Sequence, residues 1–200
     1  VDSVDQTTGK LVQFLKENKI YDNTLILICS DNGACPFDRT RGKEKDPWAP
    51  KSYWCYDTGW SHVGNTPFRL HKQNQHGGGI NSPLIAHWPK GIKTISGAIT
   101  AQRAHLVDFM ATCIDLADAE YPKSWPGIEL EPLQGKSLKP IFEGHTRTRH
   151  ESLFFRFATN RAIIQGDWKL VTHRASQWEL YNIVNDGTEL NDLASQYPEK

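Results

Sequence analysis

A carboxylate and an amide stand side by side at the end of an apolar stretch of this chain. Residues 24–30 read TLILICS, and Asp31, Asn32 and Gly33 follow directly. An apolar run of this length that ends at turn residues predicts a buried strand of a parallel α/β sheet. Ligands of open α/β sheets bind just beyond the carboxyl ends of such strands. Two adjacent oxygen donors at that position suit a hard cation such as calcium or magnesium, although the same three residues are also ordinary turn formers.

Lys72 is a second candidate for chemistry. His71 precedes it, His76 lies close by, and the glycines of residues 77–79 follow. A lysine ammonium is a compact point charge that can bind the oxygens of a sulfate or phosphate ester and stabilise charge growing in the transition state. The two histidines could contact the same substrate or protonate a leaving group. Three glycines permit a sharp turn or a close approach of backbone. Most lysines are solvated surface residues, so the role of Lys72 depends on its surroundings.

The segments that must position these residues alternate between helix and strand. Helical spacing of apolar residues covers residues 4–19 and 105–116, and strand-like runs cover residues 24–30 and 83–88. Such alternation predicts an α/β domain, which we place at residues 1–145.

A different pattern begins near residue 150. Short strand-like runs follow one another across tight turns, at residues 151–158, 161–165, 168–172 and 178–183. Consecutive short strands of this kind predict a small antiparallel α+β domain, residues 146–200. Arg147 and Arg149, at the start of this part, are expected on a solvated surface.

Residues 34–66 are rich in proline, glycine and aromatic residues, and they predict a long loop. Loops of this length without regular structure are uncommon in compact domains and are often functional. The aromatic side chains Trp48, Tyr53, Trp54, Tyr56 and Trp60 could stack on sugar rings or anchor the loop to the core.

Composition excludes several classes of function. Lys plus Arg equals Asp plus Glu at 23 each, so no net charge favours nucleic acid or an anionic membrane. No apolar run reaches the roughly 20 residues of a membrane span. The four cysteines show no CxxC spacing, which argues against a zinc or redox centre, while Cys35 and Cys55 could pair in an oxidising compartment.

The order of these motifs resembles the C-terminal half of the sulfatase family, within the alkaline-phosphatase-like superfamily. The resemblance begins with the Asp31-Asn32-Gly33 tripeptide and continues through TPFR at residues 66–69, Lys72 and the glycine run. Further landmarks are PLIAHWP at residues 83–89, GKSL at 135–138, GDWKLV at 166–171, WELY at 178–181 and ELNDL at 189–193. The expected fold is therefore the C-terminal part of an alkaline-phosphatase-like sheet sandwiched by helices, followed by the small antiparallel domain.

This resemblance implies an activity and roles for individual residues. Members of the family hydrolyse sulfate monoesters to alcohol and sulfate. Asp31 and Asn32 match two ligands of the family's Ca²⁺ ion, and Lys72 matches the lysine that contacts the sulfate group. The nucleophile is expected to be a formylglycine, made from Cys or Ser in a C/S-x-P-x-R motif of the missing N-terminal part. Cys35 is not that residue, because Pro36 follows it directly.

The implied substrate is a sulfated small molecule or sulfated carbohydrate, and the implied partner is the missing N-terminal half of the same protein. Without that half, the fragment is expected to be inactive. A periplasmic, secreted or lysosomal location is the expectation for the family. Gly77 departs from the family, which often has Glu there, so the anchoring of the loop beside Lys72 is an open question.

Two other functions stay open on the sequence. One is a phosphoester or phosphonate hydrolase of the same superfamily, because a tetrahedral anion of similar shape would suit the same residues. The other is a non-catalytic carbohydrate-binding module that uses the aromatic loop.

Overall fold

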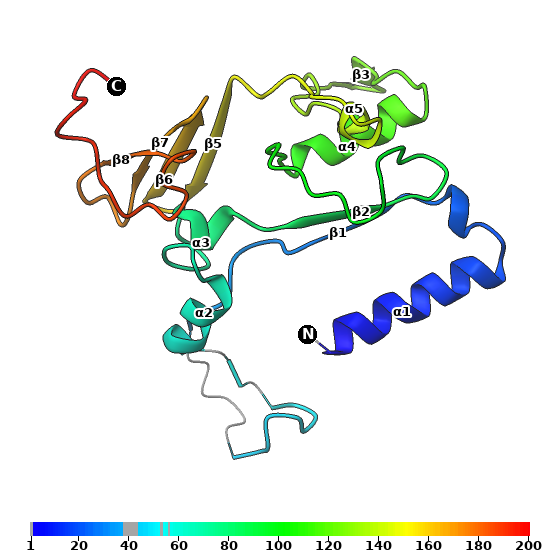
Figure 1. Ribbon diagram of the computed structural model, residues 1–200, viewed down its shortest axis with the longest axis horizontal. Helices are drawn as coiled ribbons and strands as arrows, with labels where there is room; N and C mark the ends of the chain where they lie inside the picture. The colour runs from blue at the N-terminus through cyan, green and yellow to red at the C-terminus, as the bar shows by residue number, and fades with distance from the viewer. Residues whose placement is uncertain (1, 38–43, 53, 56) are drawn as a thin grey trace. The chain divides into compact units, whose positions relative to one another are not determined.

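The computed structural model describes residues 2–37, 44–52, 54–55 and 57–200 of the chain (Figure 1). It separates into two compact units, the first formed by Val1–Ile28 with Ile85–Arg149 and the second by Cys29–Leu84 with His150–Lys200. The chain passes from one unit to the other within two strands, β1 (Ile26–Cys29) and β2 (Leu84–His87), which pair with each other. The division into domains at residue 145 stays a prediction.

The first unit contains most of the helical residues. Its elements, besides parts of β1 and β2, are α1 (Asp2–Glu17), the 3₁₀ turn η1 (Tyr21–Asn23), α4 (Val107–Leu116), the short strands β3 (Ser124–Trp125) and β4 (Ile128–Glu129), and α5 (Lys139–Phe142). The helices expected near residues 4–19 and 105–116 are confirmed. No helix in the described part of the chain is long and apolar enough to cross a bilayer.

The strand at residues 24–30 is shorter than predicted and is not buried. It covers Ile26–Cys29, its first three residues are half-buried, and Cys29 is exposed. Within the described residues β2 is the only strand paired with it, so neither edge of the pair is covered by further strands. An apolar sequence alone did not reveal this.

The prediction that Arg147 lies on a solvated surface is wrong. Arg147 is only 5% exposed, and its Nη2 donates to Asp108 Oδ2 at 2.8 Å. Asp108, on α4, also accepts the Lys136 N–H at 2.8 Å. A buried guanidinium needs such partners, and here the ion pair joins the segment after α5 to α4.

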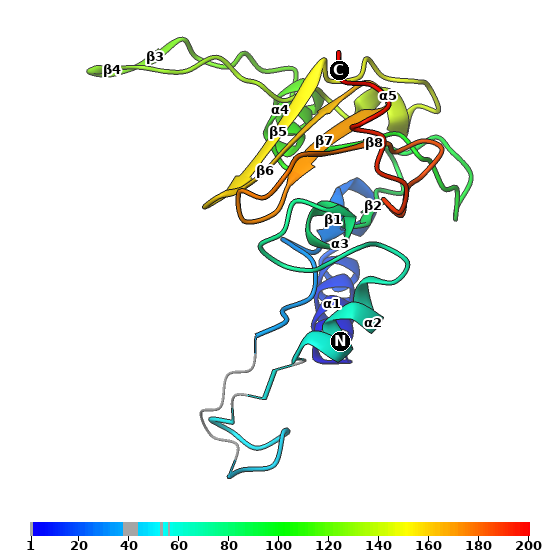
Figure 2. The ribbon, with the colours of Figure 1, turned by 90° about the vertical axis from the view of Figure 1, so that its left-hand side faces the viewer.

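The second unit contains a four-stranded antiparallel sheet in the order β5-β6-β7-β8 (Figure 2). Its strands are β5 (Ser152–Phe157), β6 (Asn160–Gln165), β7 (Trp168–Thr172) and β8 (Glu179–Asn182). The predicted antiparallel arrangement is confirmed. One face carries the buried cluster of Ala162, Val171 and Tyr181. Ala162 pairs with Val171, and Val171 pairs with Glu179, which lies two residues before Tyr181, so the three side chains point to the same side.

The long segment after Gly33 is not without regular structure. It contains the helix α2 (Asp57–Asn65), which holds the segment after Gly33 by two contacts. Asn65 Oδ1 accepts the Ala34 N–H at 3.0 Å, and Ser61 Oγ donates to the Cys35 carbonyl at 2.5 Å.

The aromatic residues of this segment do not act as core anchors where they are described. Trp48 is 82% exposed and Trp60 is 72% exposed. Tyr53 and Tyr56 lie outside the described residues.

Candidate functional site

Two backbone hydrogen bonds join the segment of Asp31 and Asn32 to the segment of Lys72. The Gly33 N–H donates to the Gly79 carbonyl at 3.0 Å, and the Lys72 N–H donates to the Ala34 carbonyl at 3.1 Å. Both segments belong to the second unit. The structure therefore places the predicted metal ligands and the predicted sulfate-binding lysine on adjacent stretches of backbone.

Glycine makes this close approach possible. A Cβ on Gly33 would lie 1.7 Å from the Gly78 carbonyl oxygen, and a Cβ on Gly78 would lie 2.0 Å from the Leu70 carbonyl oxygen. Side chains cannot occupy such positions without moving the backbone. This confirms the expectation of a close backbone approach at the glycine run, whose residues form the short helix α3 (Gly77–Ile80).

Asp31 and Asn32 present oxygen atoms where a cation could bind. Asp31 is exposed, Asn32 is half-buried, and Asn32 Nδ2 donates to Asp31 Oδ1 at 3.0 Å. This bond orients the pair and leaves Asp31 Oδ2 and Asn32 Oδ1 as donors for a cation. The donor chemistry fits calcium, which takes about six to eight oxygen ligands, so two residues make only part of a site. Within the part of the chain that the structure describes, no group of three or more His, Cys, Asp or Glu side chains could hold a metal ion.

The other predicted site residues lie on the loop between Arg69 and Gly79. Lys72 and His71 are half-buried, whereas His76 has no exposed surface. Asn74 Nδ2 lies 3.2 Å from His71 Nδ1, within hydrogen-bond distance. Direct contact of these residues with a substrate stays a prediction, and the burial of His76 favours a structural role for that residue.

A carboxylate of the antiparallel sheet gathers three donors at one oxygen. Glu179, the first residue of β8, accepts at Oε2 from Arg69 Nη1 at 3.0 Å, from His76 Nε2 at 2.9 Å and from the Tyr181 hydroxyl at 2.5 Å. Arg69 and His76 stand on either side of Lys72 in the sequence. Arg69 is therefore an ion-pair partner in this structure.

A second carboxylate binds the backbone of the glycine run. Glu189, after β8, is only 1% exposed, and its Oε2 accepts the Gly77 N–H at 2.7 Å. Its Oε1 forms an ion pair with Lys169, itself only 2% exposed, and its carbonyl accepts from Arg69 Nη1 at 2.9 Å. The carboxylate of Glu189 thus anchors the loop at Gly77, which has no carboxylate of its own.

A third contact reaches the residue next to Lys72. Asn160, the first residue of β6, donates from Nδ2 to the Gln73 carbonyl at 2.7 Å and accepts the Arg174 N–H at Oδ1 at 2.6 Å. The sheet therefore contacts the loop at its beginning, its middle and its end.

The electrostatics of this network follow from burial and from these bonds. Burial lowers the pKa of His76, and its hydrogen bond to Glu179 opposes that shift only in part. Nδ1 of His76 is buried with no hydrogen-bond partner among the described residues, so a proton there would have no acceptor. Burial raises the pKa of Glu179, but the hydrogen bonds from Tyr181 and His76 and the charge of Arg69 outweigh it and lower that pKa to about 2. At neutral pH the pair is a carboxylate and a neutral imidazole.

Sequence reasoning did not identify the sheet residues of this network. Glu179, Tyr181, Glu189 and Lys169 all fall in segments quoted as landmarks, but no role was derived for them. A usable signal exists in the strand period: Lys169 and the apolar Val171 lie two residues apart, so they share one face of β7, and a lysine on a core face requires a carboxylate partner.

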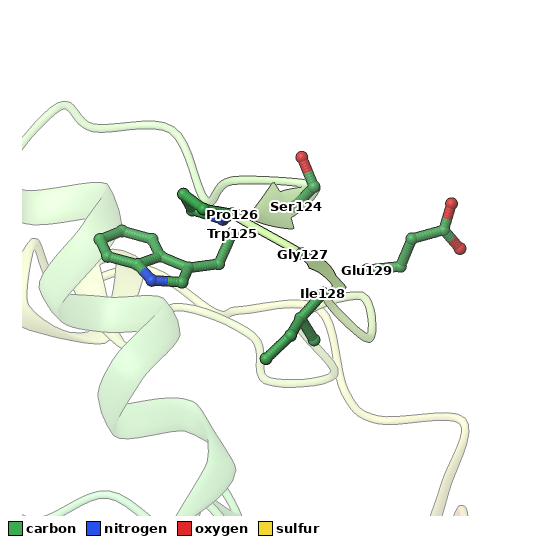
Figure 3. A pocket seen from close by; sticks show the side chains of 6 residues that line it. All are labelled: Ser124, Trp125, Pro126, Gly127, Ile128 and Glu129. Atoms are coloured by element: carbon green, nitrogen blue, oxygen red, sulfur yellow. The ribbon is translucent and has the colours of Figure 1, made fainter.

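Two other features stand apart from this network. Cys35 is half-buried and is a free thiol. A cavity of about 460 Å³ lies in the first unit at the β3–β4 hairpin (Figure 3). It is lined by Ser124, Trp125, Pro126, Gly127, Ile128 and Glu129. None of the candidate site residues lines it.

Two family models match the chain. The model described as Sulfatase matches residues 1–119, and the model described as N-sulphoglucosamine sulphohydrolase, C-terminal, matches residues 70–199. The chain belongs to the sulfatase family.

Individual sulfatases resemble most of this chain but are much longer. The chain is 25% identical to a sulfatase of Formosa agariphila, over 99% of the chain and 35% of that protein. It is 33% identical to the N-acetylgalactosamine-6-sulfatase of Sus scrofa, over 71% of the chain and 24% of that protein. The chain thus spans about a third or less of these relatives.

A solved structure gives the same result for the fold. Ps i-CgsB, whose crystal structure is known alone and in complex with k-i-k-neocarrahexaose, is 26% identical to this chain and matches it with a TM-score of 0.70. The match covers 98% of this chain and 38% of that one. The predicted alkaline-phosphatase-like α/β fold of this sulfatase chain is confirmed.

Proposed function

We propose that this chain is part of an enzyme that hydrolyses a sulfate monoester of a carbohydrate to alcohol and sulfate, with calcium as cofactor. Membership of the sulfatase family supports the reaction. The name of the Sus scrofa relative, an N-acetylgalactosamine-6-sulfatase, supports a carbohydrate substrate. Because the chain spans a minor part of its relatives, the proposal concerns the whole protein that contains it.

The single observation that carries the proposal is the junction of Asp31-Asn32-Gly33 with the Lys72 loop. Its two backbone hydrogen bonds join the segment of Asp31 and Asn32 to the segment of Lys72, which supports a site where oxygen donors and an ammonium group act together. A hydrolase of sulfate esters needs this combination, because its substrate is a tetrahedral anion whose charge is redistributed as the ester bond breaks.

Each residue then has a defined role. Lys72 would bind oxygens of the sulfate group and stabilise the charge that shifts to them in the transition state. Asp31 and Asn32 would hold the calcium ion together with ligands from elsewhere, and the bound ion would polarise the sulfate group as a Lewis acid. The formylglycine nucleophile, expected outside these 200 residues, stays a prediction, as does a periplasmic, secreted or lysosomal location.

Sulfate release by the full-length protein tests this proposal. With N-acetylgalactosamine 6-sulfate and a panel of other sulfated sugars as substrates, Lys72→Ala should lower kcat/KM by about 10²–10³-fold, because an electrostatic donor to the transition state is lost. Asp31→Ala should have a similar effect, whereas Lys123→Ala, an exposed lysine of the first unit, should change nothing. Circular dichroism should show that all variants stay folded.

Other outcomes would favour the rival functions. Release of phosphate from phosphomonoesters or phosphonates, without sulfate release, would indicate a phosphoester or phosphonate hydrolase. A full-length protein that binds sulfated sugars without turnover, and whose affinity for them is the same in the wild type and in Lys72→Ala, would indicate a carbohydrate-binding module.

A further inference from the structure

We propose that Glu179 is a positioning residue, which holds Lys72 in its working place through the loop of residues 69–77. The inference rests on the proposed function for the role of Lys72. It goes beyond that function because Glu179 belongs to the antiparallel sheet and acts on the reaction only through the loop.

Glu179 fixes the loop at both ends with one oxygen atom. Arg69 Nη1 lies 3.0 Å from Glu179 Oε2, and His76 Nε2 lies 2.9 Å from the same oxygen. The Arg69 carbonyl also accepts the Gly78 N–H at 2.7 Å, which closes the loop on itself. Lys72 lies between these two points in the chain, so both anchors of its loop depend on one carboxylate.

The strand holds the carboxylate itself in one orientation. Tyr181, two residues along β8 and on the same face, donates its hydroxyl to Glu179 Oε2 at 2.5 Å. Tyr181 is only 2% exposed and belongs to the core cluster of the sheet. The carboxylate is therefore built on a packed strand, which gives more precise placement than a loop can.

Neighbouring contacts determine what the loop can still do when Glu179 is changed. Glu189 holds the Gly77 N–H, and Asn160 holds the Gln73 carbonyl. These bonds keep the loop attached to the sheet, so loss of the Glu179 charge is expected to loosen the loop without detaching it. The guanidinium of Arg69 would lose its anionic partner, and such a group is costly to leave half-buried and uncompensated.

Precise placement matters for Lys72 because of its chemistry. Its ammonium is a point charge on a flexible stem, so the backbone must supply the precision that the side chain lacks. A misplacement of about 1 Å can reduce a catalysed rate by about 10²-fold. Loosening the loop should therefore reduce kcat more than it changes KM.

The test compares Glu179→Gln with wild type in the full-length protein and in the Lys72→Ala background. If Glu179 acts through Lys72, the substitution should lower kcat for sulfate release by about 10–100-fold in wild type. It should cost no more than about twofold when Lys72 is already Ala, because the group that it positions is gone. Equal losses in both backgrounds would overturn the proposal, since a general structural effect would be independent of Lys72. Glu199→Gln, an exposed carboxylate near the end of the chain, is the matched control and should leave kcat unchanged.

A second measurement separates this proposal from the proposed function. Amide hydrogen exchange of residues 69–78 should be faster in Glu179→Gln than in wild type or Glu199→Gln, whether or not sulfate esters are substrates. Unchanged exchange would overturn the positioning role. Absence of sulfate release by the wild type, with faster exchange in the variant, would instead refute only the proposed function. If Glu179→Gln does not fold, Tyr181→Phe removes the hydroxyl that donates to Glu179 and accepts from Arg69 Nη1, keeps the carboxylate itself, and should show the same pattern with a smaller amplitude.

Discussion

Gly33 shows how narrowly single positions are constrained beside the predicted metal ligands. Its missing side chain allows Gly78 to approach, and this approach carries the bond between the Gly33 N–H and the Gly79 carbonyl. The residues of the tripeptide Asp31-Asn32-Gly33 therefore have two different roles. The first two residues offer oxygen donors, and the third permits the backbone contact that sets them beside Lys72.

Gly33→Ala should damage both stability and activity of the full-length protein. A Cβ 1.7 Å from a carbonyl oxygen forces the backbone apart, and overpacking of this kind costs about 1–3 kcal/mol. Urea unfolding and sulfate release measure the two effects. The matched control is Gly59→Ala in α2, where a Cβ would meet nothing within 4 Å. That change should stabilise the helix by about 0.5–1 kcal/mol. Equal stabilities of the two variants would contradict the role of Gly33.

Residue types and order were enough to predict which side chains carry the proposed chemistry, but not what holds them. Asp31, Asn32 and Lys72 stand next to recognisable strand and glycine signals. Glu179 lies 110 residues beyond its partner in the loop and Glu189 lies 112 residues beyond its own, and contacts of this range leave no local pattern in the sequence. Only the spacing of Lys169, two residues before the apolar Val171 in an expected strand, offered an indirect clue to an acidic partner.

At the scale of elements, the antiparallel sheet was predictable and the helix α2 was not. Alternating side chains and tight turns define β5 to β8 in the sequence. The α2 segment contains Gly59 and Gly64, which are poor helix formers, and it lies among prolines and aromatic residues. Ser61 and Asn65 of this helix make tertiary contacts with the segment after Gly33, and local sequence propensity does not predict such contacts.

The junction of the Lys72 loop and the sheet should weaken as the pH falls. The pKa of His76 is lowered from its ordinary 6.5, so the unfolded chain binds a proton before the folded one does. Its contribution to stability is complete above pH 6.5 and is lost as the pH falls below that value. Glu179, with a folded pKa of about 2 against an ordinary 4.5, adds a second loss as the pH falls from 4.5 toward 2. His173, whose pKa burial also lowers, acts in the same direction as His76.

Urea unfolding of the full-length protein between pH 8 and pH 5 checks this expectation. The free energy of unfolding should fall with pH in wild type and fall less steeply in His76→Asn, which cannot take up the proton. His62→Asn, an exposed histidine of α2, should follow the wild type. Parallel curves for wild type and His76→Asn would show that His76 does not titrate differently in the folded and unfolded states.

At the scale of the whole molecule, the chain carries one part of the proposed active site. It spans 35% of the Formosa agariphila sulfatase and 38% of Ps i-CgsB, so the proposed site must be completed by residues that it does not contain. Calcium takes about six to eight oxygen ligands, and Asp31 and Asn32 provide only some of them. The chain contributes a junction between its antiparallel sheet and two segments of the proposed site. Glu179 of the sheet binds the loop that carries Lys72, and that loop is hydrogen-bonded to the turn after β1.

A crystal structure of the full-length protein with calcium and inorganic sulfate would test the central claim most directly. Oxygens of Asp31 and Asn32 should lie about 2.3–2.6 Å from the calcium ion. The Lys72 ammonium should lie about 2.7–3.2 Å from an oxygen of the sulfate bound to that same ion. A calcium ion held by other residues, or a sulfate bound beyond the reach of Lys72, would contradict the account.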